Sequence, residues 1–478
     1  MPERERSASA KARPKPASFG AAMRQIRSCV ALLALAIGCS ESPPRGLVLV
    51  TVDTLRADAL GTYGAPGDLT PELDRLAQQS LVFTSAYAPA PFTYPSIAAV
   101  LTGRHPGALG IQTNLSRIPP EVPTLASRLR EHGFRTGAAV SSYVLRGKAL
   151  LASHFDVYDD TLAESPQPGG VAERAATGTT DAALGVLDRL LGAPDGAPPR
   201  FFLWVHYQDP HGPYTPPAAL ARRARALEPD AGRLDVLASN HGGAGIPAYQ
   251  VLGDEREVAF YRAGYRGEVA YLDIEFGRLR EGLAARGLDD RILLAFSADH
   301  GEALGEHDVW FAHGHDLTDE LLRVPLLLNG PGIPAGRRDD VASLVDLAPT
   351  LLRHLLGPEA GASLPGRDLL ANGAAEQTSV PYFDTLAYGA TRRTGLLADG
   401  YKLILTWRDG VWQSRLFRRG HEDVDLSASA PQLASSLRER LEDVQREALD
   451  GGRAELRQEL SADERARLEA LGYGDTTP

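Results

Sequence analysis

The sequence predicts an α/β protein in which a mostly parallel sheet has helices on both faces, with a small α+β subdomain at the C-terminal end. Continuous apolar runs such as 47–52 are typical of parallel strands that are buried on both faces. Helical segments separate these runs along the chain, and this alternation predicts helices on both faces of the sheet. From residue 371 the pattern changes to short runs joined by Asp-Gly turns, which predict antiparallel strands.

Strands and helices alternate through residues 47–370, which we expect to form the main domain. The expected strands are 47–52, 134–141, 201–207, 292–297 and 324–329. The expected helices are 70–79, 123–133, 180–192, 254–286 and 346–357. Gly133 and Gly357 fit helix ends, because glycine readily adopts the backbone conformation needed there. Residues 371–478 are expected to form the C-terminal subdomain, with two or three strands in 394–417 and helices at 432–449 and 460–471.

Composition limits the class of protein. The chain has 478 residues, of which 43% are apolar and 23% are charged, so it can bury a large core. Its net charge of −11 argues against nucleic-acid binding. Both cysteines, Cys29 and Cys39, precede the part that is expected to fold. The main domain therefore has neither a cysteine nucleophile nor cysteine-bound zinc.

Residues 1–38 have the pattern of a leader. Arg24 and Arg27 precede an apolar run of about ten residues, which is too short to span a bilayer. The run stops at Cys39 and resembles a bacterial lipoprotein signal, with Cys39 as the lipidated residue and 39–46 as a tether. We therefore expect an exported protein that its lipid attaches to a membrane. An uncleaved anchor and a plain export signal are the alternatives, and Met23 is an alternative start.

Acidic residues and a histidine follow two of the expected strands. Asp53 comes directly after 47–52, and Asp299 and His300 come shortly after 292–297. Because the carboxyl ends of parallel strands lie at the same edge of a sheet, we expect these side chains to meet. Two carboxylates and an imidazole suit Ca²⁺, Mg²⁺, Mn²⁺ or Zn²⁺. For any single one of these residues, a helix cap is the ordinary alternative.

Thr93 is the candidate nucleophile. In the segment 88–106, Pro95 fits the first turn of a short helix and Gly103 fits its end, so Thr93 lies at the helix N-terminus. The helix dipole there favours an anion, and a neighbouring metal ion would lower the pKa of the hydroxyl. An ordinary N-cap threonine is the alternative.

Two clusters of polar residues follow strands that end at the same expected edge of the sheet. The first consists of His206, Asp209 and His211, and the second of His307, His313 and His315. A single histidine is usually a structural or surface residue. Two dense clusters at one edge favour a functional site.

Five segments resemble, in order, the motifs of sulfatases of the alkaline-phosphatase-like superfamily. The segments are TVDTLRADALGTYG, APAPFTYPSIAAVLTGRHP, VHYQDPHGPY, SADHGEALGEH and DELLRVPLLL. The resemblance covers residues 47–370. It implies the fold of that superfamily, the hydrolysis or transfer of an ester, and one divalent metal ion.

The resemblance also implies roles for individual residues. The implied metal ligands are Asp53, Thr93, Asp299 and His300, and the implied substrate-binding residues are His211, His313, His315, Lys148 and Asn114. Among these, His211 matches a histidine that contacts the ester oxygens. His313 and His315 flank the place where a lysine is usual, and together with His211 they leave room for a second metal ion.

The chain departs from the family at the residue that sulfatases modify. Sulfatases convert the Cys or Ser of a Cys/Ser-x-Pro-x-Arg motif into formylglycine. Here Thr93 occupies that place, and Ile97 replaces the arginine. Because threonine would give a ketone and not an aldehyde, no formylglycine is expected. The position after Asp53, where a second aspartate is common, is Thr54.

Three functions are therefore considered. The favoured one is a metal-dependent hydrolase or transferase of phosphate-type esters, such as a phosphodiesterase, with Thr93 as the nucleophile and His211 as a catalytic residue. The second is the hydrolysis of sulfate esters without formylglycine. The third is a non-catalytic surface protein that binds anions or glycans. The expected substrates are small-molecule, glycan or lipid-headgroup esters.

Overall fold

The computed structural model describes residues 44–147, 151–163, 173–192, 199–240, 243–371, 381–387 and 391–449, with a few positions beyond 449.

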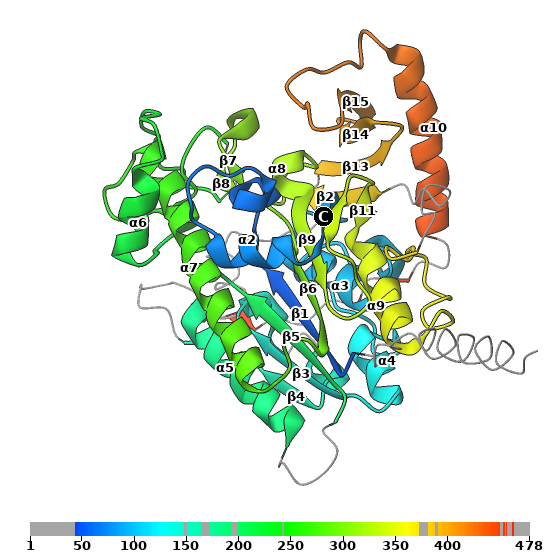
Figure 1. Cartoon of the computed structure of the whole chain (residues 1–478). Helices are drawn as coiled ribbons and strands as arrows, with labels where there is room; N and C mark the ends of the chain where they lie inside the picture. Colours follow the sequence, from blue (N-terminus) through cyan, green and yellow to red (C-terminus); the bar gives the residue numbers. More distant parts are fainter. Residues whose placement is uncertain are drawn as a thin grey trace, which may run out of the picture. The chain divides into compact units, whose positions relative to one another are not determined.

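A sheet of nine strands forms the centre of the described main domain (Figure 1). Its order is β10-β2-β9-β6-β1-β5-β3-β4, and β11 also pairs with β2. The bounds are β1 Gly46–Val52, β2 Leu81–Tyr87, β3 Arg135–Val140, β4 Val157–Asp159, β5 Phe201–Tyr207, β6 Ile292–Ala298, β9 Arg323–Asn329, β10 Gly336–Arg338 and β11 Ala342–Ser343. Two short strands, β7 Ala303–Leu304 and β8 Trp310–Ala312, pair separately.

The strands of this sheet run parallel to their neighbours, with one exception. β9 is antiparallel to both β2 and β6. For β9 to run parallel to β6, the chain would have to cross over from the carboxyl ends of the strands back to their amino ends. Between β6 and β9 the chain has β7, β8, a 3-10 turn at Glu306–Asp308 and the four-residue helix α8 (Asp319–Leu322), and it re-enters the sheet without such a crossover. The predicted mostly parallel sheet is confirmed, and the apolar run at 324–329 is its antiparallel member.

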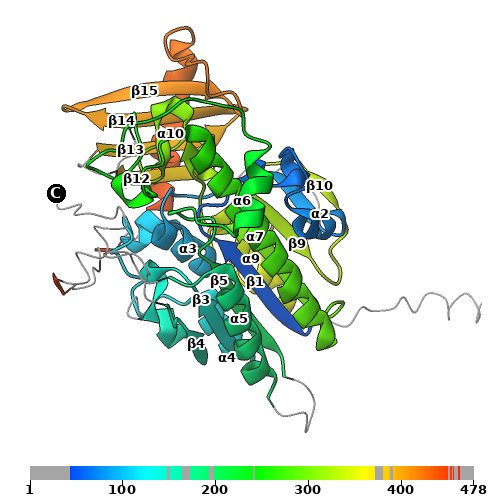
Figure 2. The ribbon, with the colours of Figure 1, turned by 90° about the vertical axis from the view of Figure 1, so that its left-hand side faces the viewer.

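Helices cover both faces of the sheet, as predicted (Figures 1 and 2). On one face α5 and α2 pack against α7, and α6 packs on α7, while α3, α4 and α9 pack together on the other face. Their bounds are α2 Pro71–Gln78, α3 Thr93–Thr102, α4 Leu125–Glu131, α5 Ala176–Leu191, α6 Ala218–Arg225, α7 Val258–Ala285 and α9 Leu347–Leu356. Within the described part of the chain, these helices are too short or too polar to cross a membrane.

The C-terminal sheet is antiparallel, with the order β12-β13-β14-β15. Its elements are β12 Tyr382–Ala387, β13 Thr391–Ala398, β14 Tyr401–Arg408, β15 Val411–Arg418 and the helix α10 Pro431–Ala448. Phe383 and Ile404 belong to the core of the main domain, whereas Leu403 packs with Leu437 of α10. The predicted antiparallel strands are confirmed and extended by β12, and most of the helix predicted at 460–471 lies outside the described residues.

Candidate active site

Asp53 and Asp299 lie side by side because they follow adjacent parallel strands. Val52 at the end of β1 is level with Ala298 at the end of β6. The backbone pairing continues one residue further, since Asp299 N donates to Val52 O at 3.1 Å and Asp53 N donates to Tyr207 O at 2.9 Å. Both carboxyl groups are therefore held by the sheet and not by a mobile loop.

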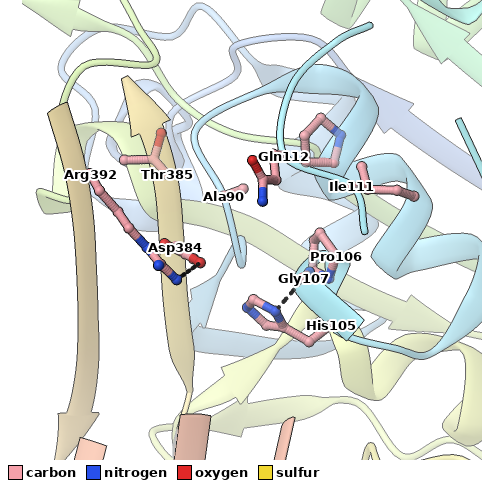
Figure 3. Close-up of a pocket in the computed structure, with 10 residues that line it drawn as sticks. Ala90, His105, Pro106, Gly107, Ile111, Gln112, Asp384, Thr385 and Arg392 are labelled. Atoms are coloured by element: carbon pink, nitrogen blue, oxygen red, sulfur yellow. Dashed lines mark hydrogen bonds and ion pairs between the residues drawn. The ribbon is translucent and has the colours of Figure 1, made fainter. Parts of the chain in front are cut away.

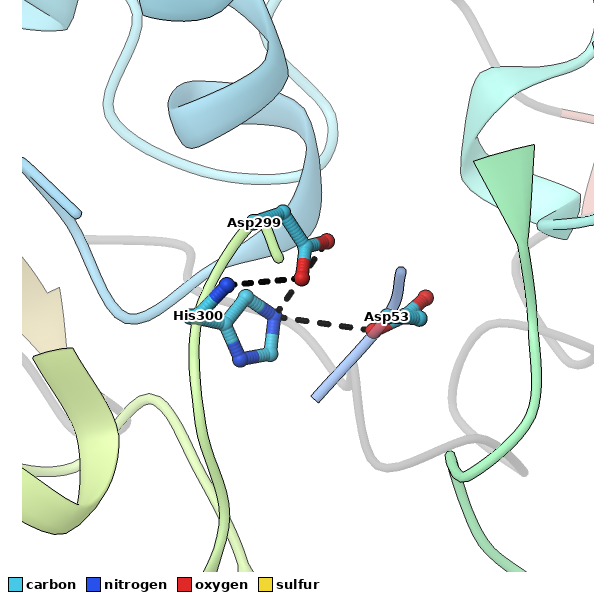
Figure 4. A group of neighbouring side chains, drawn as sticks. All are labelled: Asp53, Asp299 and His300. Atoms are coloured by element: carbon cyan, nitrogen blue, oxygen red, sulfur yellow. Dashed lines mark hydrogen bonds and ion pairs between the residues drawn. The ribbon is translucent and has the colours of Figure 1, made fainter. Parts of the chain in front are cut away.

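His300 completes a group of three buried side chains at this edge (Figure 4). One potential ligand atom from each of Asp53, Asp299 and His300 lies within 4.8 Å of the others. His300 Nε2 is 3.7 Å from Asp53 Oδ1 and 3.8 Å from Asp299 Oδ2. His300 Nδ1 is 2.9 Å from Gly301 O, and a carbonyl can only accept, so Nδ1 carries the proton in the neutral ring and the Nε2 lone pair faces the carboxylates.

Some carboxylate oxygens of this group accept no hydrogen bond in the described structure. Both oxygens of Asp53 and Oδ2 of Asp299 are buried and have no hydrogen-bond partner among the described residues. Burial acts to raise the pKa of Asp53, but His211, His206 and His300 outweigh it and the pKa is lowered. Burial and the charge of Asp53 raise the pKa of Asp299. Buried acceptors that converge on an imidazole lone pair fit a divalent cation, which would supply the missing partner.

Thr93 is the first residue of α3, as its sequence context predicts. The side chain is buried, and Oγ1 lies 3.4 Å from His300 Nε2. Gly103 ends the helix with a φ of 64°, a left-handed conformation that glycine adopts without the strain of a side chain. The hydroxyl therefore lies at the positive end of a ten-residue helix and next to the candidate metal group.

Asn114 contacts the same helix end. Its Oδ1 accepts a hydrogen bond from Tyr94 N at 2.8 Å, which satisfies one of the open N–H groups in the first turn of α3. Its Nδ2 is buried and has no partner among the described residues. The Asn114 side chain is therefore held in place through its oxygen, which binds the residue after Thr93, and its Nδ2 can still donate a hydrogen bond to a ligand.

His211 and His313 continue the site from His300. The ring centroids of His300 and His313 are 4.6 Å apart, and those of His313 and His211 are 5.2 Å apart. His211 Nδ1 is 2.7 Å from Gly212 O, so this nitrogen donates to the carbonyl. Burial, followed by the neighbouring rings of His300 and His211, lowers the pKa of His313, which favours its neutral form.

Of the remaining predicted site residues, the structure describes His315 but not Lys148 or Cys39. His315 has Asp316 and Arg393 of β13 among its charged neighbours, and burial lowers its pKa to about 4. Its ring also forms a hydrogen bond with the backbone of His313, so the structure places it behind His313. Lys148 and Cys39, with the whole leader, lie outside the described residues, so their roles and the lipid anchor stay predictions.

Two residues to which the sequence gave no individual role also join the site. His206 Nε2 lies 3.7 Å from Asp53 Oδ2, and its Nδ1 lies 2.9 Å from Thr51 Oγ1. The signal in the sequence was a histidine inside an otherwise apolar strand, and the structure adds the register that sets it level with Thr51. Glu302 is fully buried, its Oε1 lies 3.1 Å from His313 Nδ1, and burial raises its pKa to about 7.

A mostly parallel sheet with two buried carboxylates at its carboxyl edge, next to a hydroxyl that begins a helix, is the arrangement that the sequence motifs of the alkaline-phosphatase-like superfamily lead us to expect. A sulfatase family model matches residues 45–358. The chain therefore belongs to the sulfatase family. Members of this family are ester hydrolases, and a metal-dependent mechanism is typical of them.

Two curated relatives illustrate the extent of the likeness. Arylsulfatase A of Homo sapiens is 28% identical over 430 residues, which cover 85% of this chain and 81% of the relative. The ulvan-active sulfatase of Formosa agariphila is 27% identical over 338 residues, which cover 66% of this chain. The chain spans only 62% of the length of that second relative.

Solved structures share the fold. BT4656 in complex with its substrate D-glucosamine-2-N,6-O-disulfate aligns with a TM-score of 0.69 at 20% identity, over 86% of this chain and 99% of that one. The phosphonate monoester hydrolase of Agrobacterium radiobacter aligns with a TM-score of 0.66 at 19% identity, over 85% and 96%. The fold is thus common to proteins named for sulfate and for phosphonate esters, and it does not distinguish between them.

Proposed function

We propose that this protein is a metal-dependent hydrolase of phosphate-type esters that uses the hydroxyl of Thr93 as its nucleophile. The observation that carries the proposal is the position of that hydroxyl, at the start of α3 and 3.4 Å from His300 Nε2. Sulfatases carry the precursor of formylglycine at this position, and threonine cannot be converted into that aldehyde. Its hydroxyl can act directly when its pKa is lowered.

The cation would be held by Asp53, Asp299 and His300, whose buried carboxylate oxygens and imidazole nitrogen converge. When bound, a divalent cation would lower the pKa of the Thr93 hydroxyl and offset the charge that develops on the ester oxygens. The dipole of α3 acts on the same oxygen in the same direction.

In the first step, Thr93 Oγ1 loses its proton to solvent and forms a bond to phosphorus. The bond from phosphorus to the alcohol oxygen breaks, and its electron pair stays on that oxygen. His211 supplies the proton that converts this oxygen into an alcohol. Because its Nδ1 donates to Gly212 O, its Nε2 is the atom that transfers the proton.

In the second step, water attacks the phosphorus of phosphothreonine and gives a proton to His211. The bond from phosphorus to Thr93 Oγ1 breaks, and Thr93 recovers a proton from solvent. Both residues then return to their initial states. An acceptor alcohol in place of water would make the same chemistry a transfer.

Asn114 and His313 would bind the oxygens that do not react. Asn114 keeps a buried N–H donor beside the start of α3. His313 lies between His300 and His211, and its Nδ1 is 3.1 Å from Glu302 Oε1. Burial raises the pKa of Glu302 to about 7, and the protonated carboxyl donates to His313 Nδ1, which leaves His313 Nε2 as a donor. Donors fixed in this way need little rearrangement when charge develops, which is how they stabilise a transition state.

The chemistry of the intermediate favours phosphorus over sulfur. Phosphothreonine is cleaved by attack at phosphorus. A sulfothreonine lacks the hemiacetal elimination that releases sulfate from formylglycine. Two phosphonate monoester hydrolases, from Agrobacterium radiobacter and Silicibacter pomeroyi, share this fold, so the fold is compatible with phosphorus chemistry.

The test compares an aryl phosphodiester with an aryl sulfate in the presence of Ca²⁺, Mg²⁺, Mn²⁺ or Zn²⁺. We expect metal-stimulated turnover of the phosphodiester and a loss on the order of 10³-fold or more in kcat for Thr93→Ala. Thr93→Ser, which keeps a hydroxyl, should retain part of the activity. Thr102→Ala is the matched control, because Thr102 is buried in the same helix but at its far end.

Each other outcome selects an alternative. Turnover of the sulfate in preference to the phosphodiester would select a sulfate-ester hydrolase that works without formylglycine. Full activity of Thr93→Ala would remove Thr93 from the mechanism. Absence of turnover with every metal would select the non-catalytic protein that binds anions or glycans.

A further inference from the structure

Three buried polar side chains lead through the sheet toward Asp53, and the proposed mechanism uses none of the three. They are Trp204 and His206 of β5 and Thr51 of β1, and all are 0% exposed. Trp204 and His206 lie on the same face of the sheet, because they are two residues apart in one strand. Thr51 is level with His206 on the neighbouring strand, so its hydroxyl can contact both of them.

The hydroxyl of Thr51 bonds to both residues of β5. Its Oγ1 accepts a hydrogen bond from Trp204 Nε1 at 2.9 Å, and an indole nitrogen can only donate. The same oxygen lies 2.9 Å from His206 Nδ1. Among the described residues this hydroxyl forms no third hydrogen bond. The only acceptor for its own proton is therefore His206 Nδ1.

The tautomer of His206 follows from this arrangement. If Nδ1 accepts from Thr51, the proton of the neutral ring is on Nε2. The other tautomer would leave the hydroxyl proton of Thr51 buried without an acceptor. It would also turn the lone pair of Nε2 toward a carboxylate oxygen, because Nε2 lies 3.7 Å from Asp53 Oδ2. Both arrangements are unfavourable where water is excluded, so Nε2 carries the proton.

His206 thus presents an N–H group to one oxygen of Asp53 only. Oδ2 faces His206 Nε2, whereas Oδ1 lies 3.7 Å from His300 Nε2, within the candidate metal group (Figure 4). A distance of 3.7 Å is longer than a normal hydrogen bond, so the N–H attracts Oδ2 electrostatically without a closed bond. The two oxygens of one carboxylate are therefore distinguished by their neighbours.

We propose that these three side chains form a hydrogen-bond relay that makes Asp53 a one-oxygen ligand of the metal ion, with Oδ1 as the ligating atom. The relay runs from Trp204 through Thr51 to His206, and the inference rests on the proposed function, whose metal ion the relay serves. His206 is then a positioning residue and not a metal ligand, because a ring nitrogen that carries a proton has no lone pair for a metal ion.

The first arm of the test determines the tautomer of His206 in the metal-free full chain. Nitrogen NMR of protein with isotope-labelled histidine reports which ring nitrogen carries the proton, and the His206 signals are those missing from His206→Gln. We expect the proton on Nε2 in the wild type and in Thr51→Ser. The signals should change in Thr51→Val, which keeps the shape of the side chain but lacks the hydroxyl. A proton on Nδ1 in the wild type, in a neutral or a charged ring, would overturn the relay.

The second arm measures metal affinity by calorimetric titration with Ca²⁺, Mg²⁺, Mn²⁺ and Zn²⁺. Thr51→Val should bind the preferred cation about tenfold more weakly, because residues that orient a ligating group typically contribute about 10–100-fold to metal affinity. Thr51→Ser, which restores the hydroxyl, should recover the affinity.

Thr136→Val is the matched control for the second arm. Thr136 is buried in the same sheet, and its Oγ1 also takes part in two hydrogen bonds, since it donates to Asp156 Oδ2 at 3.1 Å and accepts from Asp156 N at 3.1 Å. It lies at the amino end of β3, away from the carboxyl edge that carries the metal group. We expect this variant to lose stability but to keep its metal affinity.

The outcomes separate the relay from the proposed function. Wild-type affinity in Thr51→Val, or equal losses of affinity in Thr51→Val and Thr136→Val, would overturn the relay even in an enzyme that hydrolyses phosphodiesters. The expected tautomer and loss of affinity without any phosphodiester turnover would refute the proposed function and leave the relay standing. Absence of binding of all four cations by the wild type would refute both.

Discussion

Two groups of acidic and histidine side chains in this protein have similar geometry but differ in what neutralises them. The first is Asp53, Asp299 and His300, and the second is His307, Glu320 and Glu422. In each group, one potential ligand atom per residue lies within 4.8 Å of the others. By proximity alone both would be metal sites.

The second group already has a cation of the chain itself. The buried Lys402 Nζ lies 2.8 Å from Glu422 Oε1 and 2.8 Å from Asp319 Oδ1. Burial acts to lower the pKa of Lys402, but the two carboxylates outweigh it and raise the pKa, so the ammonium stays charged. Lys402 thus supplies positive charge to Glu422, while the other carboxylate of the group, Glu320, has Oε1 3.9 Å from His307 Nε2.

The first group has no such cation. In the part of the chain that the structure describes, Asp53 and Asp299 form ion pairs with histidines and with neither lysine nor arginine. The comparison teaches that converging ligands are not sufficient evidence for a metal site. The better criterion is a buried negative charge that the protein leaves without an internal counter-ion.

The largest expected effect comes from Asp299→Ala, which removes a ligand from the first group. We expect loss of the bound metal and a fall in kcat/KM on the order of 10³-fold, because the nucleophile would no longer be activated. Elemental analysis of the purified protein measures the metal content. His307→Ala in the second group should leave it unchanged, and retention of metal by Asp299→Ala would reject the ligand assignment.

A smaller effect is expected from Lys402→Met, which removes the internal cation of the second group. The carboxylates of Asp319 and Glu422 would be left without their partner, so the free energy of unfolding should fall by about 3 kcal/mol. Urea denaturation measures this change. Arg446→Met, which breaks an exposed pair with Asp443, should cost less than about 0.5 kcal/mol. Equal losses in the two variants would show that Lys402 does not hold the second group together.

His206→Phe tests whether the first group depends on its neighbouring imidazole. Residues that orient ligating carboxylates typically contribute about 10–100-fold to metal affinity, and His206 Nε2 faces Asp53 Oδ2. We expect a loss in that range by calorimetric titration with the metal. His206→Gln, which keeps a polar group toward Asp53, should recover part of the affinity. Wild-type affinity in the phenylalanine variant would exclude this orienting role.

A pH-dependent effect is expected from His315, which belongs to neither group. Burial lowers its pKa from 6.5 to about 4, so below pH 6.5 the unfolded chain binds a proton that the native chain does not. The free energy of unfolding should therefore fall as the pH falls from 6.5 to 4, by at most about 1.4 kcal/mol per pH unit from this residue. His315→Gln should flatten the slope, and His132→Gln, an exposed control, should not. If the free energy of unfolding of His315→Gln depended on pH as that of the wild type does, the pH dependence would not come from His315.

The sequence predicted the parts of the site that depend on local pattern. Asp53 and Asp299 could be placed because apolar runs mark buried strands and parallel strands end at one edge. Thr93 could be placed because Pro95 and Gly103 mark the two ends of its helix. In these cases the local chemistry of the backbone determines the position of the side chain.

The remaining features depend on register and long-range packing, which a local pattern does not contain. His206 reaches Asp53 only because β1 and β5 pair with Thr51 level with His206. The antiparallel direction of β9 follows from the path of the chain between β6 and β9. A cavity of about 150 Å³ joins His105 to Asp384, which is nearly 280 residues later in the chain (Figure 3).

Acid-quenched mass spectrometry of the peptide that contains Thr93 tests the central claim most directly. The protein is mixed with metal and an aryl phosphodiester, stopped during turnover and digested. We predict a phosphoryl group on the Thr93 side chain, absent when substrate is omitted. A phosphoryl group on another residue, or release of product with no covalent adduct on Thr93 at any time point, would contradict the account.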